Sequence, residues 1–242
     1  MQSHKHNDHH LTNRLSSLKK GAIACLPVAF GVFVYGSVFG VLANASGLLI
    51  FEIFLMSAIV FSGAAQFAVL DLWTNPLPVF EIALATLLIN MRYVLITASL
   101  RNRMSDLKWW QWFLPIHLCA DENWAITMAR TPQDGNVMFL FGSGLTLMLF
   151  WQIGGFIGFF AGSILPQPEL IGLDFAFTAG FIGLVGSFWK TNKDWLIWSA
   201  SALGAIVSAN ILPGSWFIMG GAMCGIIAAI ATSIFFNQTK QT

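Results

Sequence analysis

The chain has 242 residues, of which 56% are hydrophobic and only 10% charged, and its mean hydropathy is +0.70. Soluble domains carry about a quarter charged residues, so this chain has too few charges to cover a water-facing surface. The composition therefore predicts an integral membrane protein. The net charge of +1 gives no case for nucleic acid as a partner. The three cysteines lie in apolar segments and indicate packing, and no motif predicts a metal ion or another cofactor.

The chain begins with a polar leader over residues 1–20, which holds four of the five histidines and is predicted to be a solvated tail. Eight apolar segments follow, each about as long as a helix must be to cross a hydrocarbon core of roughly 30 Å: 21–43, 48–70, 79–100, 109–128, 137–161, 171–189, 195–211 and 216–236. We therefore predict an all-α polytopic membrane protein with about eight transmembrane or re-entrant helices, some of them broken. One transmembrane domain is expected over 21–236, followed by a short tail over 237–242.

Lysine and arginine in the short connections predict the orientation, because these residues accumulate on the cytoplasmic side. Basic regions place both termini and one connection in the cytoplasm: the leader, Lys190 with Lys193, and the tail with Lys240. Loops without Lys or Arg are placed outside: 44–47, 162–170 and 212–215. Eight crossings, which we favour, satisfy these positions but leave Arg101, Arg103 and Lys108 outside. In the alternative, the second and fourth segments are re-entrant, and six crossings bring those three residues inside.

Polar clusters interrupt the first two segments. Pro27 removes a backbone donor and frees a carbonyl group, while Gly31 tolerates the resulting bend; a kink without function is the alternative. In the second segment, Ser62 and Gly63 followed by Gln66 indicate a broken helix lined by hydrogen-bonding groups. Broken helices offer half-helix ends that bind the charged ends of small zwitterions. The alternative there is small-residue packing, in which Gln66 bonds a neighbouring helix.

The third segment carries Asn90 and Arg92 about two-thirds along its length. Arg92 either snorkels to the interface, or it pairs with Asp121 or with a substrate carboxylate, for which a planar guanidinium gives a bidentate fit. We predict that Arg92 and Asp121 pair or converge within one polar cavity.

The fourth segment contains two adjacent carboxylates, Asp121 and Glu122, at membrane depth. Carboxylates there are costly and usually face a cavity or a partner charge, and a carboxyl group in apolar surroundings can take up a proton near neutral pH. His117 is expected to share a helix face with Asp121 at i, i+4, so these three residues are the candidates for proton coupling. The alternatives are an Arg92 ion pair that only fixes helix packing, and His117 as an ordinary core residue.

Glycines at four-residue spacing indicate helices that pack closely, in part against another chain. They occur in the first, fifth and eighth segments: Gly36 and Gly40, then Gly154, Gly158 and Gly162, then Gly221 and Gly225. Tryptophans gather at segment ends, as expected for an interfacial belt.

The ordered clusters resemble the AzlC family, the large subunit of branched-chain amino acid exporters, over nearly the whole chain. The family pattern has Pro-Val-Ala-Phe in the first helix, Ser…Ala-Gly-Ala-Ser-Gln-Phe in the second, Asp/Asn-x-Arg-His…Ser-Leu-Arg in the third and Asp-Glu in the fourth. The corresponding stretches here are Leu26–Phe30, Ser57–Phe67, Asn90–Arg101 and Ala120–Asn123.

Two departures stand out. The serine is Ser62, with Ala64 and Ala65 where the family serine is expected, and Tyr93 replaces the family histidine. The resemblance implies a small multi-helix membrane subunit of AzlD type as partner, and export driven by an ion gradient.

These observations together predict the larger subunit of a secondary exporter for branched-chain or other neutral apolar amino acids, coupled to the proton gradient in the cytoplasmic membrane. The candidate substrate-binding residues are Pro27, Gly31, Ser62, Gly63, Gln66, Asn90 and Arg92. No His-Glu-x-x-His, Gly-x-Ser-x-Gly or P-loop motif is present, so an enzyme is not expected. One alternative is the permease of a transport ATPase, which would need a cytoplasmic coupling loop longer than these. Another is a non-transporting assembly or sensor subunit, which would not need an acidic pair at depth.

Overall fold

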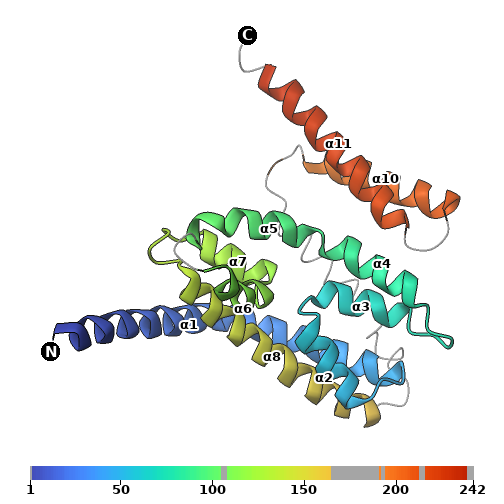
Figure 1. Cartoon of the computed structure of the whole chain (residues 1–242). Helices are drawn as coiled ribbons and strands as arrows, with labels where there is room; N and C mark the ends of the chain where they lie inside the picture. Colours follow the sequence, from blue (N-terminus) through green and yellow to red (C-terminus); the bar gives the residue numbers. More distant parts are fainter. Residues whose placement is uncertain (1, 105–107, 165–190, 192–193, 213–215, 239–242) are drawn as a thin grey trace. The chain divides into compact units, whose positions relative to one another are not determined.

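The structure is a computed structural model, and it describes residues 2–104, 108–164, 191, 194–212 and 216–238. All regular elements in these residues are helical (Figure 1), which confirms the all-α prediction for this part of the chain. The sixth predicted segment, 171–189, lies outside the described residues, as do Lys190 and Lys193. The helices are α1 (Gln2–Ala45), α2 (Ile50–Ile59), α3 (Gly63–Asp71), α4 (Val79–Asn90), α5 (Arg92–Leu100), η1 (Arg101–Arg103), η2 (Trp109–Gln111), α6 (Phe113–His117), α7 (Asp121–Met128), α8 (Val137–Ile164), α10 (Asp194–Ile211) and α11 (Trp216–Gln238).

Three of the described helical stretches are long and apolar enough to cross a membrane: Arg14–Ala45, Val79–Arg103 and Val137–Ile164. Two shorter apolar stretches are Ile50–Ile59 and Met219–Ile234. The first helix begins at Gln2, well before the first apolar segment, so the polar leader continues into it as one helix. The described residues fall into two compact units: the first holds residues 2–70 with the described residues of 90–164, and the second holds residues 71–89 with the described residues of 191–238.

In the first unit, α1 and α8 lie side by side and run in the same direction (Figure 1). The contacts follow both helices in order, because Gly21 meets Phe139, Gly36 meets Trp151 and Gly40 meets Gly155. A β-carbon built on Gly21 would lie only 2.0 Å from the carbonyl oxygen of Phe139, so no larger residue fits this crossing. The prediction of close glycine packing is confirmed here.

The partner of these glycines is the chain itself. A β-carbon on Gly154 would lie 2.3 Å from the carbonyl oxygen of Phe33, and one on Gly158 1.9 Å from that of Ser37, both on α1. In the second unit, Gly221 of α11 meets Ser201 and Ala205 of α10. The part of the interpretation that placed these ridges against another chain is therefore not needed to explain them.

The second and fourth predicted segments are both broken, as their polar interruptions predicted. The second consists of α2 and α3 on either side of Val60–Ser62, and the fourth consists of η2, α6 and α7 with a break after His117. The third segment changes from α4 to α5 at Met91.

The fourth segment enters and leaves at the same end of the α1–α8 pair. Arg103, just before it, donates from Nη1 to the carbonyl oxygen of Gly135 at 2.6 Å and from Nη2 to that of Arg130 at 2.8 Å. Both acceptors lie between α7 and α8, where α8 begins. A segment that crossed a core of roughly 30 Å would separate these groups by that distance. The preference for a crossing fourth segment is therefore wrong, and the re-entrant alternative holds for it.

With the fourth segment as a hairpin, Arg101, Arg103 and Lys108 no longer have to lie outside, so the placement of Lys and Arg in the cytoplasm has no exception. Arg103 now lies beside Arg130, and Arg130 lines a pocket together with Lys20 at the start of the first apolar segment. Basic residues before and after the hairpin, together with Lys20 on α1, thus gather at one end of the unit, as expected for a cytoplasmic face. Apolar length alone did not reveal the hairpin, since the run 109–128 is long enough to span.

We predict that residues on both sides of the hairpin are accessible from one side of the membrane. Lys108→Cys and Gln133→Cys, in a Cys224→Ala background that leaves the buried Cys25 and Cys119 in place, should react with an impermeant maleimide from the same side. Ser46→Cys, at the other end of α1, should react from the opposite side and serves as the control. Labelling of Lys108→Cys and Gln133→Cys from opposite sides would restore the crossing model.

Candidate functional site

A buried amide holds the break in the second segment. Gln66, at the start of α3, donates from Nε2 to the carbonyl oxygen of Val60 at 2.5 Å, and its Oε1 accepts from Ser57 Oγ at 3.1 Å. Trp151 of α8 donates from Nε1 to the same Oε1 at 3.2 Å and to Ser57 Oγ at 3.2 Å. Gln66 is 1% exposed, and both ends of its amide are used. These contacts favour the interpretation in which Gln66 bonds a neighbouring helix and shapes the break.

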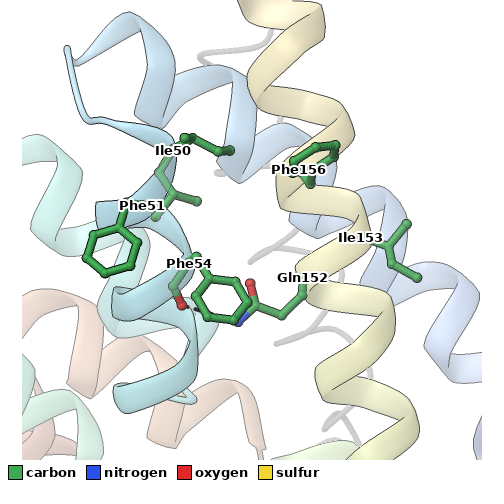
Figure 2. A pocket seen from close by; sticks show the side chains of 7 residues that line it. Ile50, Phe51, Phe54, Gln152, Ile153 and Phe156 are labelled. Carbon is green, nitrogen blue, oxygen red and sulfur yellow. Dashed lines mark hydrogen bonds between the residues drawn. The ribbon is translucent and has the colours of Figure 1, made fainter.

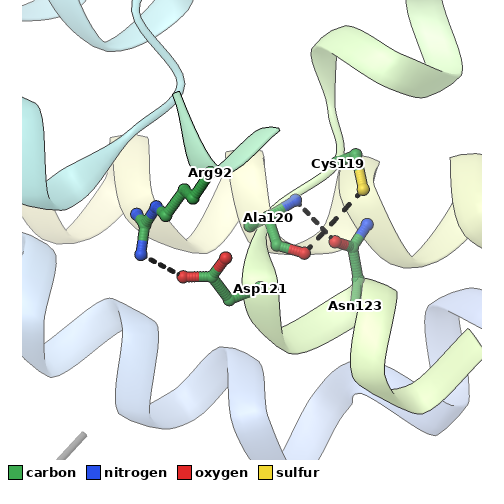
Figure 3. A network of polar contacts seen from close by, with 5 residues as sticks. All are labelled: Arg92, Cys119, Ala120, Asp121 and Asn123. Carbon is green, nitrogen blue, oxygen red and sulfur yellow. Dashed lines mark hydrogen bonds and ion pairs between the residues drawn. The ribbon is translucent and has the colours of Figure 1, made fainter. Parts of the chain in front are cut away.

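A second buried amide holds the break in the fourth segment. Asn123, which is fully buried, accepts from the backbone N–H of Ala120 at 2.7 Å. Its Nδ2 donates to the carbonyl oxygens of Leu118 at 3.0 Å and of Leu140 on α8 at 3.3 Å. Figure 3 shows this amide beside Ala120, where α7 begins. The helix ends before Asp121 because the side chain of Asn123 takes over the backbone groups that a continuous helix would pair.

This break corrects one premise drawn from the sequence. His117 ends α6 and Asp121 begins α7, so the two residues do not share a face at i, i+4 as expected for one helix. His117 Nε2 instead lies 2.8 Å from the carbonyl oxygen of Ala58 on α2. A carbonyl oxygen only accepts, so this nitrogen carries the proton.

The two breaks meet in the first unit. The contact between His117 and Ala58 joins the end of α6 to the end of α2. Phe61 from one break and Ala120 from the other pack on a single buried cluster formed by Cys25, Ala29 and Leu147. Residues far apart in sequence are thus brought to one place near the middle of α1 and α8.

The charges of the site are paired. Arg92 Nη1, at the start of α5, donates to Asp121 Oδ2, at the start of α7 (Figure 3). The two side chains are 34% and 15% exposed, and the Arg92 guanidinium lies 5.2 Å from the ring centre of Tyr93. The predicted pairing of Arg92 with Asp121 is confirmed. Trp124 Nε1 also donates to Ser99 Oγ at 2.9 Å, which holds α5 and α7 together.

Several polar atoms around the ion pair have no partner. Ser62 Oγ, Asn90 Oδ1 and Arg92 Nε are buried and make no hydrogen bond of normal geometry in the described structure. Ser62 lies beside the phenol of Tyr93, which links the first of these atoms to the Arg92 end of α5. Most buried polar groups in proteins are hydrogen-bonded, so a cluster of free donors and acceptors indicates a place for a polar ligand.

The other predicted site residues lie around this centre in different ways. Glu122 lies within electrostatic reach of Cys25 on α1 and also of Asp121 and Arg92. Gly63 contacts the Trp151 ring, since a β-carbon there would lie 2.9 Å from Cη2. Pro27 and Gly31 are exposed on α1, and a β-carbon on Gly31 would meet nothing within 4 Å. The structure does not bring these last two residues to the ion pair by any described contact.

Sequence reasoning missed Asn123 and Trp151. Asn123 directly follows the acidic pair and stands three residues after Ala120, the spacing of a helix-start cap, so its role had a local signal. Trp151 lies 85 residues from Gln66 in the chain, and nothing local connects the two.

An apolar groove between α2 and α8 is separate from this polar site (Figure 2). It has a volume of about 410 Å³ and is lined by Ile50, Phe51, Ile53, Phe54, Gln152, Ile153 and Phe156. Gln152 Nε2 donates to the carbonyl oxygen of Phe54 at 3.2 Å, and so ties α8 to α2. The groove offers almost no polar group beyond this amide and does not suit a zwitterion.

We predict that Asn123→Leu destabilises the protein, because it leaves the backbone N–H of Ala120 and the carbonyl oxygen of Leu118 without the partner that Asn123 provides. Each such group costs roughly 1–3 kcal/mol, so thermal unfolding in detergent should shift down by several degrees or more. The matched control is Asn210→Leu, an exposed amide of α10 that bonds only its own helix, at Ile206. Equal shifts for both variants would show that the amide does not hold the break.

The fold and the site define an integral membrane protein with discontinuous helices that meet at a partly buried ion pair, an architecture in which secondary transporters build their binding sites. The chain belongs to the AzlC family, because the family model described as AzlC protein matches residues 27–165. That range contains both breaks and the ion pair.

Relatives in several microorganisms cover most of the chain. A protein of Bacillus subtilis named branched-chain amino acid transport protein AzlC is 26% identical over 207 residues, which are 85% of this chain and 80% of the relative. Inner membrane protein YgaZ of Escherichia coli is 25% identical over 228 residues, 89% of this chain and 90% of the relative. An uncharacterised membrane protein of Helicobacter pylori is 25% identical over 219 residues, 89% and 95% of the two chains. No solved structure matches this chain at a significant level.

Proposed function

We propose that the protein is the large subunit of a secondary exporter for branched-chain or other neutral apolar amino acids, driven by the proton gradient. The observation that carries this proposal is the ion pair of Arg92 and Asp121 at the meeting point of two broken segments, with unpartnered polar atoms around it. The name of the Bacillus relative supports the substrate class. The outward direction rests on the resemblance of the sequence clusters to the exporter family.

The charged groups of the substrate insert between Arg92 and Asp121 and take the place of their direct contact. The substrate carboxylate binds the Arg92 guanidinium, whose Nε makes no hydrogen bond in the described structure. The substrate ammonium group binds Asp121 together with Asn90 Oδ1 or Ser62 Oγ. The exchange of one ion pair for two charged contacts keeps every charge compensated, so the substrate does not expose a bare charge in the membrane. Gln66 and Gly63 shape the break, and Pro27 and Gly31 lie on the adjoining part of α1.

The aliphatic side chain of the substrate packs on the apolar residues beside the breaks. Phe61, Ala120, Ile126 and Phe150 are partly buried around the cluster of Cys25, Ala29 and Leu147. Branched side chains gain from such contact roughly in proportion to the apolar area that they bury. A charged side chain would lose its hydration among these apolar residues, a cost that a branched aliphatic side chain does not have.

In this proposal, proton coupling depends on the acidic pair, Asp121 and Glu122. When the substrate leaves, Asp121 either returns to Arg92 or takes up a proton, and Glu122 on the next helix position holds a second exchangeable proton. His117 positions the pair by tying α6 to α2 through its proton on Nε2. A proton bound from one side and released on the other couples inward proton flow to outward amino acid flow.

We place the protein in the cytoplasmic membrane as a multi-pass chain with both termini in the cytoplasm, where the basic end of the first unit lies. The E. coli relative is named an inner membrane protein, in agreement with this placement. A small multi-helix subunit of AzlD type is the proposed partner. Expressed alone, the chain should transport poorly; full export activity of the purified single chain would count against an obligate partner.

Proteoliposomes test the function. The chain, with and without an AzlD-type subunit, is reconstituted and loaded with radiolabelled leucine, valine or isoleucine, and lysine serves as a charged control. We expect efflux of the branched-chain amino acids that an imposed pH gradient accelerates and an uncoupler removes. Equal rates for lysine and leucine, or no effect of any gradient in the paired complex, would contradict the proposal.

A further inference from the structure

We infer that the basic end of the first unit contains a binding site for the phosphate headgroup of an anionic phospholipid. The site is a pocket of about 560 Å³ between α1 and the connection from α7 to α8. It is lined by Lys20, Ile23, Ala24, Ala129, Arg130, Thr131, Asp134 and Phe139. This ligand is unrelated to the transported substrate, so the inference does not depend on the proposed function.

The cations of this pocket are not neutralised by the protein. In the described part of the chain, Arg92 and Asp121 are the only side chains within ion-pair distance, so neither Lys20 nor Arg130 has a carboxylate partner. Arg130 Nε is buried and makes no hydrogen bond, while its guanidinium lies 4.6 Å from the ring centre of Phe139. Two cations face one carboxylate in the lining, Asp134, whose Oδ2 already accepts from the Thr131 hydroxyl at 3.0 Å.

Specific contacts within the protein hold the walls of this pocket in place. Gly21 lets α1 approach the backbone of Phe139 closely, since a β-carbon there would lie 2.0 Å from its carbonyl oxygen, and this brings Lys20 beside the α8 start. Arg103 fixes the opposite wall by donating to the carbonyl oxygens of Arg130, Thr131 and Gly135. Asn136 Nδ2 donates to Ser17 Oγ at 3.1 Å and closes the end of the pocket against α1.

The surroundings favour a lipid over a dissolved anion. Ile23, Ala24 and Phe139 give the pocket an apolar wall, and Ile23 is 57% exposed on the outer surface of α1. Trp109 and Trp110, exposed just after the basic stretch that contacts the pocket wall, are typical of the level where lipid headgroups lie. Basic pockets between helices on the cytoplasmic side bind anionic headgroups. A phosphate can thus contact Lys20 and Arg130 while its acyl chain follows Ile23.

Lipid binding to the full-length protein tests this site. Phosphatidylglycerol, phosphatidylcholine or inorganic phosphate is added to the protein in detergent, and binding is followed by native mass spectrometry and thermal unfolding. We expect phosphatidylglycerol to bind and stabilise, and its affinity to fall about fivefold for each lost cation and about 25-fold in Lys20→Gln/Arg130→Gln. The matched control is Arg101→Gln/Lys108→Gln, which removes two cations from the same end that do not line the pocket.

Three results would overturn the inference. One is equal weakening in the control double variant, which would mean diffuse attraction to the basic end. Another is protection by inorganic phosphate as strong as that by phosphatidylglycerol, which would mean a site for free anions. The third is equal binding of phosphatidylcholine. If Arg130→Gln fails to fold, the exposed Lys20→Gln alone still tests the site through its fivefold effect.

Discussion

Replacement of Arg92 with glutamine is expected to reduce transport by about 30-fold, because removal of one member of a hydrogen-bonded, partly buried charge pair costs roughly 2 kcal/mol, and each 1.4 kcal/mol is about tenfold. The variant leaves Asp121 without its cation and removes the proposed contact to the substrate carboxylate. Initial rates of leucine efflux from proteoliposomes measure the loss, and thermal unfolding of the same samples measures how much of it is due to folding.

The charge-swapped variant Arg92→Asp/Asp121→Arg separates binding from packing. The swap restores an ion pair between α5 and α7, so stability should recover relative to Arg92→Gln. Transport should not recover, because the guanidinium now projects from α7 and the carboxylate from α5, so the two charged groups of the substrate no longer meet their partners in the proposed arrangement. Recovery of both properties in the swapped protein would mean that the pair only holds the helices together.

The ion pair was predictable because charge at membrane depth has few physical solutions. Arg92 and Asp121 lie in apolar stretches where an isolated charge is costly, so a sequence with one cation and a nearby acidic pair in successive segments already suggests that they meet. The break at Ser62 and Gly63 was predictable for a similar reason, since small polar residues in mid-segment weaken a continuous helix.

The hairpin of the fourth segment was not predictable from apolar length. The residues that create it act over long distances, because Asn123 bonds Leu140 on α8 and His117 bonds Ala58 on α2, 59 residues away. Hydropathy counts how many residues could span but does not register these side-chain contacts. The basic stretch around Arg103 was the one local sign, and it conflicted with the crossing model.

The packing partner of the glycine ridges could not be predicted from the sequence either. Four-residue spacing of Gly154 and Gly158 indicates that some helix packs closely there, yet the spacing does not say which one. The structure assigns α1 of the same chain. That assignment matters for the site, because the parallel α1–α8 pair carries the cluster on which both breaks pack.

Replacement of Asp121 with asparagine is expected to abolish proton-driven accumulation while substrate binding largely persists. The amide keeps the size of the side chain and one oxygen acceptor, so it can still receive a hydrogen bond from Arg92 or from the substrate ammonium group. It cannot take up or release a proton, so substrate movement no longer depends on the gradient. Uptake into inside-out vesicles, with and without an uncoupler, measures coupling, and exchange of labelled for unlabelled leucine measures binding and movement without net flux.

Glu122→Gln is the matched comparison, because it changes the adjacent carboxylate, which makes no ion pair with Arg92 in the described structure. If Asp121 alone carries the proton, Glu122→Gln should retain gradient-driven uptake and Asp121→Asn should lose it with its exchange activity intact. If the two carboxyl groups share the proton, each single variant should keep part of the coupling and only Asp121→Asn/Glu122→Gln should lose it. A double variant that still concentrates leucine, or wild-type uptake that the uncoupler does not change, would rule out proton coupling at this pair.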